Sequence, residues 1–178
     1  MALLEILTFP DPRLAQPATN VEVVDDALRK LIDDMFETMY AAEGVGLAAP
    51  QVGVLKRLIV LDCGEREKDD QRPLPPVQPY AIINPTIVAK EGEIVWEEGC
   101  LSVPGYTDEV NRAAKVTVEG LDRNGQPLHI EAEGLLAVCL QHEIDHLEGT
   151  IFLDRLSRLK QSMVKKKLRK KAEEEARP

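Results

Sequence analysis

Apolar side chains recur at helical spacing in residues 25–42. They fall three or four positions apart, at Leu28, Ile32, Met35, Phe36 and Met39. This period is typical of an amphipathic helix, and acidic residues at positions 25 and 26 favour the positive end of the helix dipole. Gly44 and Gly46 follow, and we expect the helix to end there in a loop that leads into residues 47–49.

Short runs rich in Val and Ile occupy the middle of the chain and predict strands. We expect these strands over residues 57–62, 80–88, 92–96, 115–121 and 127–133. The Asn-Gly pair at 124–125 predicts a tight turn between the last two. Pro and charged residues dominate positions 64–79, which indicates an exposed loop. The middle of the chain is therefore predicted to be antiparallel sheet.

Two further helices are expected toward the C-terminal end. The segment between Gly134 and Gly149 is apolar on nearly every side in its first half, a pattern typical of a buried helix. Residues 154–176 predict a strongly basic helix. The fold class that follows is α+β, with antiparallel sheets packed around the central buried helix, an N-terminal helix and a C-terminal helix.

Length and composition fit one compact unit. The chain has 178 residues, of which 44% are hydrophobic, and we expect one domain over residues 1–160 followed by a helical extension over 161–178. The formal net charge of −9 gives no indication of DNA binding. Neither a secretory signal nor an apolar run of about 20 residues, the length of a membrane span, is recognised. The expectation is a cytoplasmic protein that does not contact a membrane.

The chemistry-bearing pattern of the predicted buried helix is His142-Glu143-Ile144-Asp145-His146. Residues four apart stand on one face of a helix, so two imidazoles can reach one metal ion. Glu143 is adjacent to that face and can take a proton from water at the ion. Two surface histidines on a polar helix are the plain alternative, but these two are among only three histidines in the chain.

A hydrolytic metal site of this type needs a third protein ligand. Cys100 is the best candidate, because Gly99 and Pro104 indicate an irregular, fixed backbone around it rather than a packed strand. An ordinary buried cysteine is the alternative. Three cysteines in all argue against a disulfide framework, and Cys63 and Cys139 by themselves have the properties of ordinary buried thiols.

Residues 44–53 form a third unusual segment, rich in glycine and containing Gln51. No phosphate-binding pattern is present. A glutamine amide beside such backbone could donate a hydrogen bond to an oxyanion that develops near the metal. Without the other two motifs, a plain turn would be the better interpretation.

Together the three segments resemble peptide deformylase, whose signatures are GxGLAAxQ, EGCLS and QHExDHLxG. The chain has GVGLAAPQ at 44–51, EGCLS at 98–102 and QHEIDHLEG at 141–149, in the same order, and residues 11–14 also look like the N-terminal region of the family. The resemblance implies a catalytic domain over 1–160 that removes the formyl group from the N-terminal formylmethionine of nascent polypeptides. The loop at 64–79 is longer than we expect for the family.

The resemblance also implies roles for particular residues. Cys100, His142 and His146 would bind the metal, and Glu143 would act as general base and acid. Gln51 and the backbone amide of Leu101 would stabilise the oxyanion. The residues that match the substrate pocket are Val45, Gly46, Trp96, Leu135, Val138 and Cys139.

Helical spacing supports a methionine pocket independently of the resemblance. Leu135, Val138, Cys139, His142 and His146 form a single stripe, so an apolar surface adjoins the predicted metal. An unbranched, flexible methionine side chain suits such a surface.

The sequence indicates which residues bind the metal more clearly than it indicates which metal they bind. Cysteine with two histidines suits zinc but also accepts Fe(II), Co(II) or Ni(II), and the resemblance favours Fe(II).

Charge is divided unevenly along the chain. Residues 1–150 hold 12 basic and 27 acidic side chains, whereas residues 151–178 hold 10 and 4. The basic C-terminal helix is either simply solvated or a polyanion-binding element, and the resemblance implies docking on the ribosome.

Two other functions stay open at this point. A zinc endopeptidase of the HExxH type usually takes its third ligand from downstream, and no His or Cys follows His146. An inactive relative that binds the ribosome or stores metal would not need Glu143 or Gln51.

Overall fold

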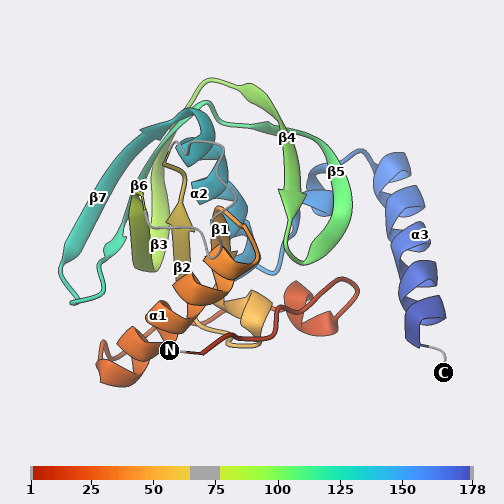
Figure 1. The fold of residues 1–178 in the computed structure, drawn as a ribbon. Coiled ribbons are helices and arrows are strands. Elements are labelled where there is room, and N and C mark those ends of the chain that lie inside the picture. Colours follow the sequence, from red (N-terminus) through yellow and green to blue (C-terminus); the bar gives the residue numbers. More distant parts are fainter. Residues whose placement is uncertain (1, 65–76, 177–178) are drawn as a thin grey trace.

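Two antiparallel sheets form the β part of the fold in a computed structural model that describes residues 2–64 and 77–176. The larger sheet has the order β1-β2-β3-β6-β7, and the smaller one is the β4–β5 hairpin (Figure 1). The strands are β1 (Gly46–Ala48), β2 (Leu58–Asp62), β3 (Pro79–Glu91), β4 (Ile94–Cys100), β5 (Val103–Arg112), β6 (Lys115–Leu121) and β7 (Pro127–Glu133). The α+β class predicted from the sequence is confirmed.

Three α-helices accompany the sheets in the described part of the chain. They are α1 (Asp26–Ala41), α2 (Gly134–Leu147) and α3 (Arg158–Ala176). The Asp25 side chain caps α1 by accepting a hydrogen bond of 2.9 Å from the backbone N–H of Leu28. The apolar face of α1 buries Ile32, Met35 and Met39 completely. None of the helices in the described part of the chain is long and apolar enough to cross a membrane.

Helix α2 lies between the larger sheet and the β4–β5 hairpin (Figure 1). Its residues Ala137, Leu140 and Leu147 are fully buried and belong to one apolar cluster with side chains of β2, β3, β6 and β7. All five residues of β2 are buried, which explains why its first four residues are apolar without alternation; the fifth is the buried Asp62. The opposite side of α2, toward the hairpin, carries His142 together with the apolar side chains of Leu135 and Val138.

Helix α3 stands on the outer side of the hairpin beside β5 (Figure 1). Val164 and Leu168 pack against a small apolar cluster that includes Val110 of β5, Ile151 and Phe152. None of its residues is buried. Its attachment to the rest of the molecule is therefore confined to one stripe of the helix.

Several predicted elements differ from the observed ones. Strand β5 was not predicted, because its sequence is mostly polar and carries a proline and a glycine near its start; only Val103, Val110 and Arg112 of this edge strand are buried. Strand β4 runs through to residue 100, so Cys100 lies at the end of a strand, which was not expected; the irregular backbone predicted there is present as a register shift between Gly99 and Cys100.

The remaining differences are at element ends. A short strand, β1, replaces part of the loop expected after α1. The C-terminal helix begins at Arg158 rather than 154, because Phe152–Arg155 form a separate 3-10 turn. The predicted loop at 64–79 falls mainly on residues 65–76, which lie outside the described residues.

Candidate active site

Helix α2 carries two histidines on the side that faces the hairpin. His142 and His146 are one turn apart, and their ring centroids are 5.1 Å from each other. Both side chains are buried, with 8% and 1% of the residue surface exposed. Such burial contradicts the alternative of two surface histidines.

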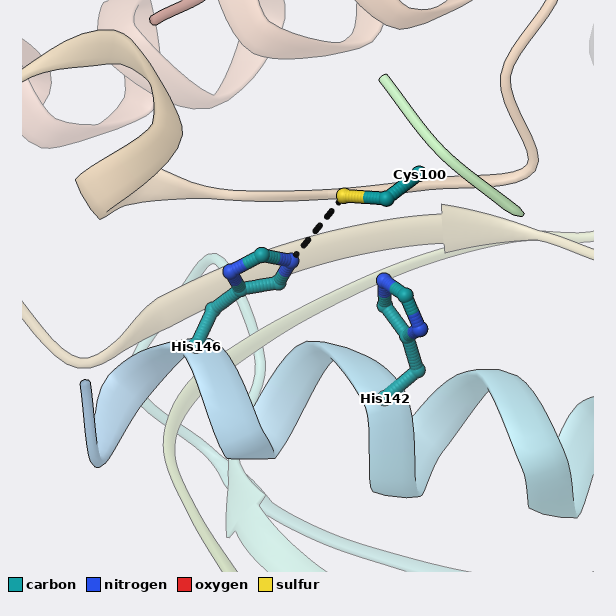
Figure 2. Close-up of side chains that lie close together, drawn as sticks. All are labelled: Cys100, His142 and His146. Carbon is teal, nitrogen blue, oxygen red and sulfur yellow. Dashed lines mark hydrogen bonds between the residues drawn. The ribbon is translucent and has the colours of Figure 1, made fainter. Parts of the chain in front are cut away.

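Cys100 meets these histidines from the end of β4. The strand register shifts between Gly99 and Cys100, immediately before the tight turn into β5. The thiol lies 3.5 Å from His146 Nε2, and Figure 2 shows it above α2 and facing both imidazole rings. One donor atom from each of Cys100, His142 and His146 lies within 4.8 Å of the other two.

These three donors fit a metal ion chemically. Burial and the charge of His142 lower the pKa of His146, which favours the neutral imidazole that ligates metals. Burial opposes a proton on His142, but the Glu143 charge, Cys100 and Glu98 outweigh it and raise the pKa of His142. A metal ion would take the place of that proton. A thiolate with two imidazoles is a donor set that transition metals bind.

Glu98, which sequence reasoning missed, binds the His142 ring at Nδ1, the nitrogen that does not face Cys100. His142 Nδ1 is 2.8 Å from Glu98 Oε1, which leaves Nε2 free to face Cys100. Arg112 of β5 donates to both Glu98 oxygens at 2.8 and 2.9 Å. Burial alone would raise the pKa of Glu98, but the hydrogen bonds from Arg112 and His142 hold it below its usual value. A charged carboxylate thus fixes the orientation of the His142 ring.

Glu143 of α2 is buried and lies against Gly46 of β1. Its Oε1 has no hydrogen-bond partner among the described residues although it is buried. Burial raises the pKa of Glu143 to about 7, with a further contribution from the nearby Glu98 charge. Gly46 makes room for this side chain, because a Cβ at that position would collide with the carboxylate. The group is therefore able to accept and return a proton near neutral pH.

The Gln51 amide points at the same place from the 3-10 turn Ala49–Val52. Its Oε1 accepts a hydrogen bond of 2.9 Å from the Ala48 backbone N–H. Nε2 is thereby directed to Ser102 Oγ at 3.0 Å and to Cys100 Sγ at 3.5 Å. The side chain is 1% exposed, so its position is fixed by the fold. This arrangement places an N–H donor beside the thiol.

A pocket of about 480 Å³ opens onto this cluster. Its lining includes all the residues predicted from the sequence except His146: Val45, Gly46, Gln51, Trp96, Cys100, Leu101, Leu135, Val138, Cys139, His142 and Glu143. His146 lies deeper, against Cys100. The structure thus brings the three sequence segments into one site, with apolar side chains of α2 and β4 beside the potential metal ligands.

A larger hollow of about 610 Å³ lies over β3, β6 and β7. It is lined largely by charged side chains of both signs, including Lys90, Lys115 and Glu131, and it contains none of the predicted site residues. Volume alone therefore does not identify the functional site in this fold.

Comparisons with known proteins agree with the geometry. Residues 3–162 match the family model described as polypeptide deformylase. A peptide deformylase from Chromobacterium violaceum is 55% identical over 171 residues, which cover 96% of this chain and 97% of the relative. The crystal structure of a peptide deformylase from Legionella pneumophila is 52% identical, with a TM-score of 0.84 and 99% of each chain covered.

A further solved structure, from Ehrlichia chaffeensis, is described as peptide deformylase in complex with actinonin. It is 49% identical, has a TM-score of 0.87, and covers 96% of this chain and 98% of its own. The match therefore extends over nearly the whole chain in sequence and in structure. The chain belongs to the peptide deformylase family.

Proposed function

We propose that this pocket removes the formyl group from the N-terminal formylmethionine of nascent polypeptides and releases formate. The observation that carries the proposal is the junction of the buried Cys100, His142 and His146 donors with an apolar pocket that also contains Glu143. Family membership supports the same reaction. A site with these parts is suited to hydrolysis of one small acyl group next to an apolar side chain.

Each residue has a definable task in this reaction. Cys100, His142 and His146 would hold the metal, which when bound supplies a Lewis acid for the formyl carbonyl and lowers the pKa of water. Glu143 takes the proton of the attacking water and returns it to the leaving amine, so that the products are formate and a free N-terminus. Gln51 Nε2 and the Leu101 backbone amide donate to the carbonyl oxygen as it gains charge.

The methionine side chain is assigned to the apolar part of the pocket. Val138 and Cys139 belong to α2, and Trp96 belongs to β4. Gly46 is the first residue of β1, and Val45 precedes it. Each of these groups adds contact area for a flexible thioether and few hydrogen-bonding groups. Substrates with a charged first side chain would lose this contact and leave a charge desolvated.

Fe(II) is the ion that we propose for the native enzyme, with zinc, nickel or cobalt as alternatives in purified protein. The Cys-His-His set accepts all four. Metal analysis after anaerobic purification decides among them: one equivalent of iron supports the proposal, and one equivalent of zinc with full activity contradicts it.

The direct test of the proposed reaction compares two blocked peptides. Protein loaded with Ni(II) or, without oxygen, with Fe(II) should release formate from formyl-Met-Ala-Ser and leave acetyl-Met-Ala-Ser nearly untouched. The acetyl group differs by one methyl on the acyl carbon, so it tests whether the site is closed around the formyl group. Equal rates for the two peptides, or cleavage at the internal peptide bonds, would contradict deformylation and favour a peptidase.

We also propose that the catalytic domain, residues 1–160, is followed by a basic extension, 161–178, that docks on the ribosome. Lys166, Lys167, Lys170 and Lys171 are exposed on α3, opposite in charge to the rest of the chain. A variant with these four lysines changed to glutamine should keep full activity on short peptides and bind ribosomes more weakly. Co-sedimentation at several salt concentrations measures this, and unchanged binding contradicts it. The substrate is made on ribosomes, so the proposal places the protein in the cytoplasm.

A further inference from the structure

The residues that hold His142 in place do not end at Arg112. Arg112 Nη1 also donates to Asp145 Oδ2 at 2.6 Å, and the Arg112 side chain is 2% exposed. Asp145 is therefore the second carboxylate on one buried guanidinium. It lies on α2 between the two histidines and does not line the pocket of about 480 Å³ that opens onto them.

Arg155 completes this set from the other side of Asp145. Its Nε donates to Asp145 Oδ2 at 3.0 Å and its Nη2 to Oδ1 at 2.6 Å, which is a bidentate pair. The Arg155 side chain is 46% exposed, and it shares with Arg112 and Asp145 the lining of a cleft of about 290 Å³ that does not include Cys100 or His142. Hence the series of contacts runs from solvent on one face to the metal ligand on the other.

Charges alternate along the series. Arg155 and Arg112 are positive, and Asp145 and Glu98 are negative, so each carboxylate has a guanidinium of its own to balance it. Without Arg155, Asp145 keeps a single cationic partner, which is the same guanidinium that orients Glu98. Asp145 and Glu98 then compete for the hydrogen bonds that Arg112 donates. As a result, the Glu98 carboxylate that orients His142 is no longer held in one position.

The 3-10 turn that contains Arg155 is itself fixed at both ends. Phe152, at its start, stacks on the His142 ring with centroids 6.1 Å apart. Asp154 forms an ion pair with Lys165 of α3, and it also accepts a hydrogen bond of 2.9 Å from the Ile151 backbone N–H. These contacts fix the backbone of the turn and thereby the point from which the Arg155 side chain reaches Asp145.

We propose that Arg155 is a positioning residue for the metal ligand His142, acting through Asp145, Arg112 and Glu98. The inference rests on the metal centre described under the proposed function. Residues that contact a metal ligand directly change metal affinity by about 10- to 100-fold when they are replaced. Arg155 acts through three intervening side chains, so replacing it should speed metal release by about 3- to 10-fold.

The test measures metal release and ligand geometry rather than turnover. Arg155→Gln, Arg155→Lys and wild-type protein are loaded with Co(II), and the release of cobalt to a chelator is followed together with the visible absorption bands of the bound ion. Arg123→Gln is the matched control, because Arg123 pairs with Asp33 at 2.9 Å, is 41% exposed and lies away from the site. Thermal unfolding of each variant checks that the fold is retained.

Support consists of faster release and shifted cobalt bands in Arg155→Gln, a smaller effect in Arg155→Lys, and no effect in Arg123→Gln. Combining Arg155→Gln with Asp145→Asn should add almost nothing to the effect of Asp145→Asn alone, since both act in one series. Wild-type release rates and bands in Arg155→Gln overturn the inference while leaving the metal centre intact. Wild-type protein that takes up no cobalt contradicts the metal centre and the inference with it.

Discussion

A single methyl group at Gly46 should separate catalysis from metal binding. Gly46 lies in β1 and has no positive φ angle, so its backbone accepts alanine. The added Cβ would collide first with Glu143 Oε2, and it would stand 2.9 Å from Cδ and 3.0 Å from Cγ, where ordinary contacts begin near 3.4 Å. Glu143 must therefore retreat by at least about 0.5 Å or adopt another rotamer.

The size of the effect follows from that displacement. A misplacement of about 1 Å can cost about 100-fold in rate, so we expect kcat of Gly46→Ala to fall by about 10- to 100-fold. This corresponds to about 1.4 to 2.7 kcal/mol in the activation barrier. Overpacking should also lower the free energy of unfolding by about 1 to 3 kcal/mol. Metal content should stay at one equivalent, because none of the three ligands needs to move.

Gly44→Ala is the matched control. The atoms nearest to its Cβ would be those of the Leu101 side chain, whose flexible end can turn away at small cost, and not those of Glu143. Formate release from formyl-Met-Ala-Ser, metal content and thermal unfolding are measured for both variants. Full activity in Gly46→Ala, or a loss of activity that merely follows a loss of metal, would refute the reasoning about the Glu143 carboxylate.

Three further predictions concern other parts of the molecule. Glu98→Gln keeps an acceptor for His142 but lacks the charge that Arg112 requires, so metal affinity should fall by about 10- to 100-fold in equilibrium titration; unchanged affinity contradicts this role. Val138→Phe should raise KM for formylmethionyl peptides without faster metal release, because the ring fills the pocket; an unchanged KM would place the methionine elsewhere. Burial alone would raise the pKa of Asp62, but hydrogen bonds from Val77, Tyr40, Gln78 and Gly64 lower it. The stabilisation it provides is therefore present above the unfolded pKa of about 3.9 and is lost as pH falls through the lower folded value. Asp62→Asn should weaken the acid dependence of unfolding, and an identical pH profile for the variant would argue against this.

The local periodicity of the sequence was enough to predict the helix that carries His142 and His146, because ligands four apart on a helix need no tertiary information. The meeting of Cys100 with His146 could not be deduced from spacing, since the two residues are 46 positions apart and come together only through the β4–β5 hairpin. Gly99 and Pro104 made Cys100 the best candidate for the third ligand, and the resemblance to a family implied its pairing with the two histidines.

Polar networks were the part that the sequence did not reveal. Glu98 and Arg112 are 14 positions apart, and Arg112 and Asp145 are 33 apart, and each looks like an ordinary surface charge in the sequence. Strand β5 escaped prediction because its sequence is mostly polar, carries a proline and a glycine near its start, and ends with the buried Arg112, so no apolar alternation marks it as a strand. Glu98 is the first residue of the EGCLS motif, and that position was a signal that could have marked it as functional.

In the proposed reaction, Glu143 moves the proton for hydrolysis of a formyl amide at the Cys100, His142 and His146 site. The most direct measurement compares formate release from formyl-Met-Ala-Ser by wild type and Glu143→Gln, with bound metal quantified in the same samples. We expect one equivalent of metal in both and a rate at least about 100-fold lower in the variant. Equal rates at equal metal content would contradict it.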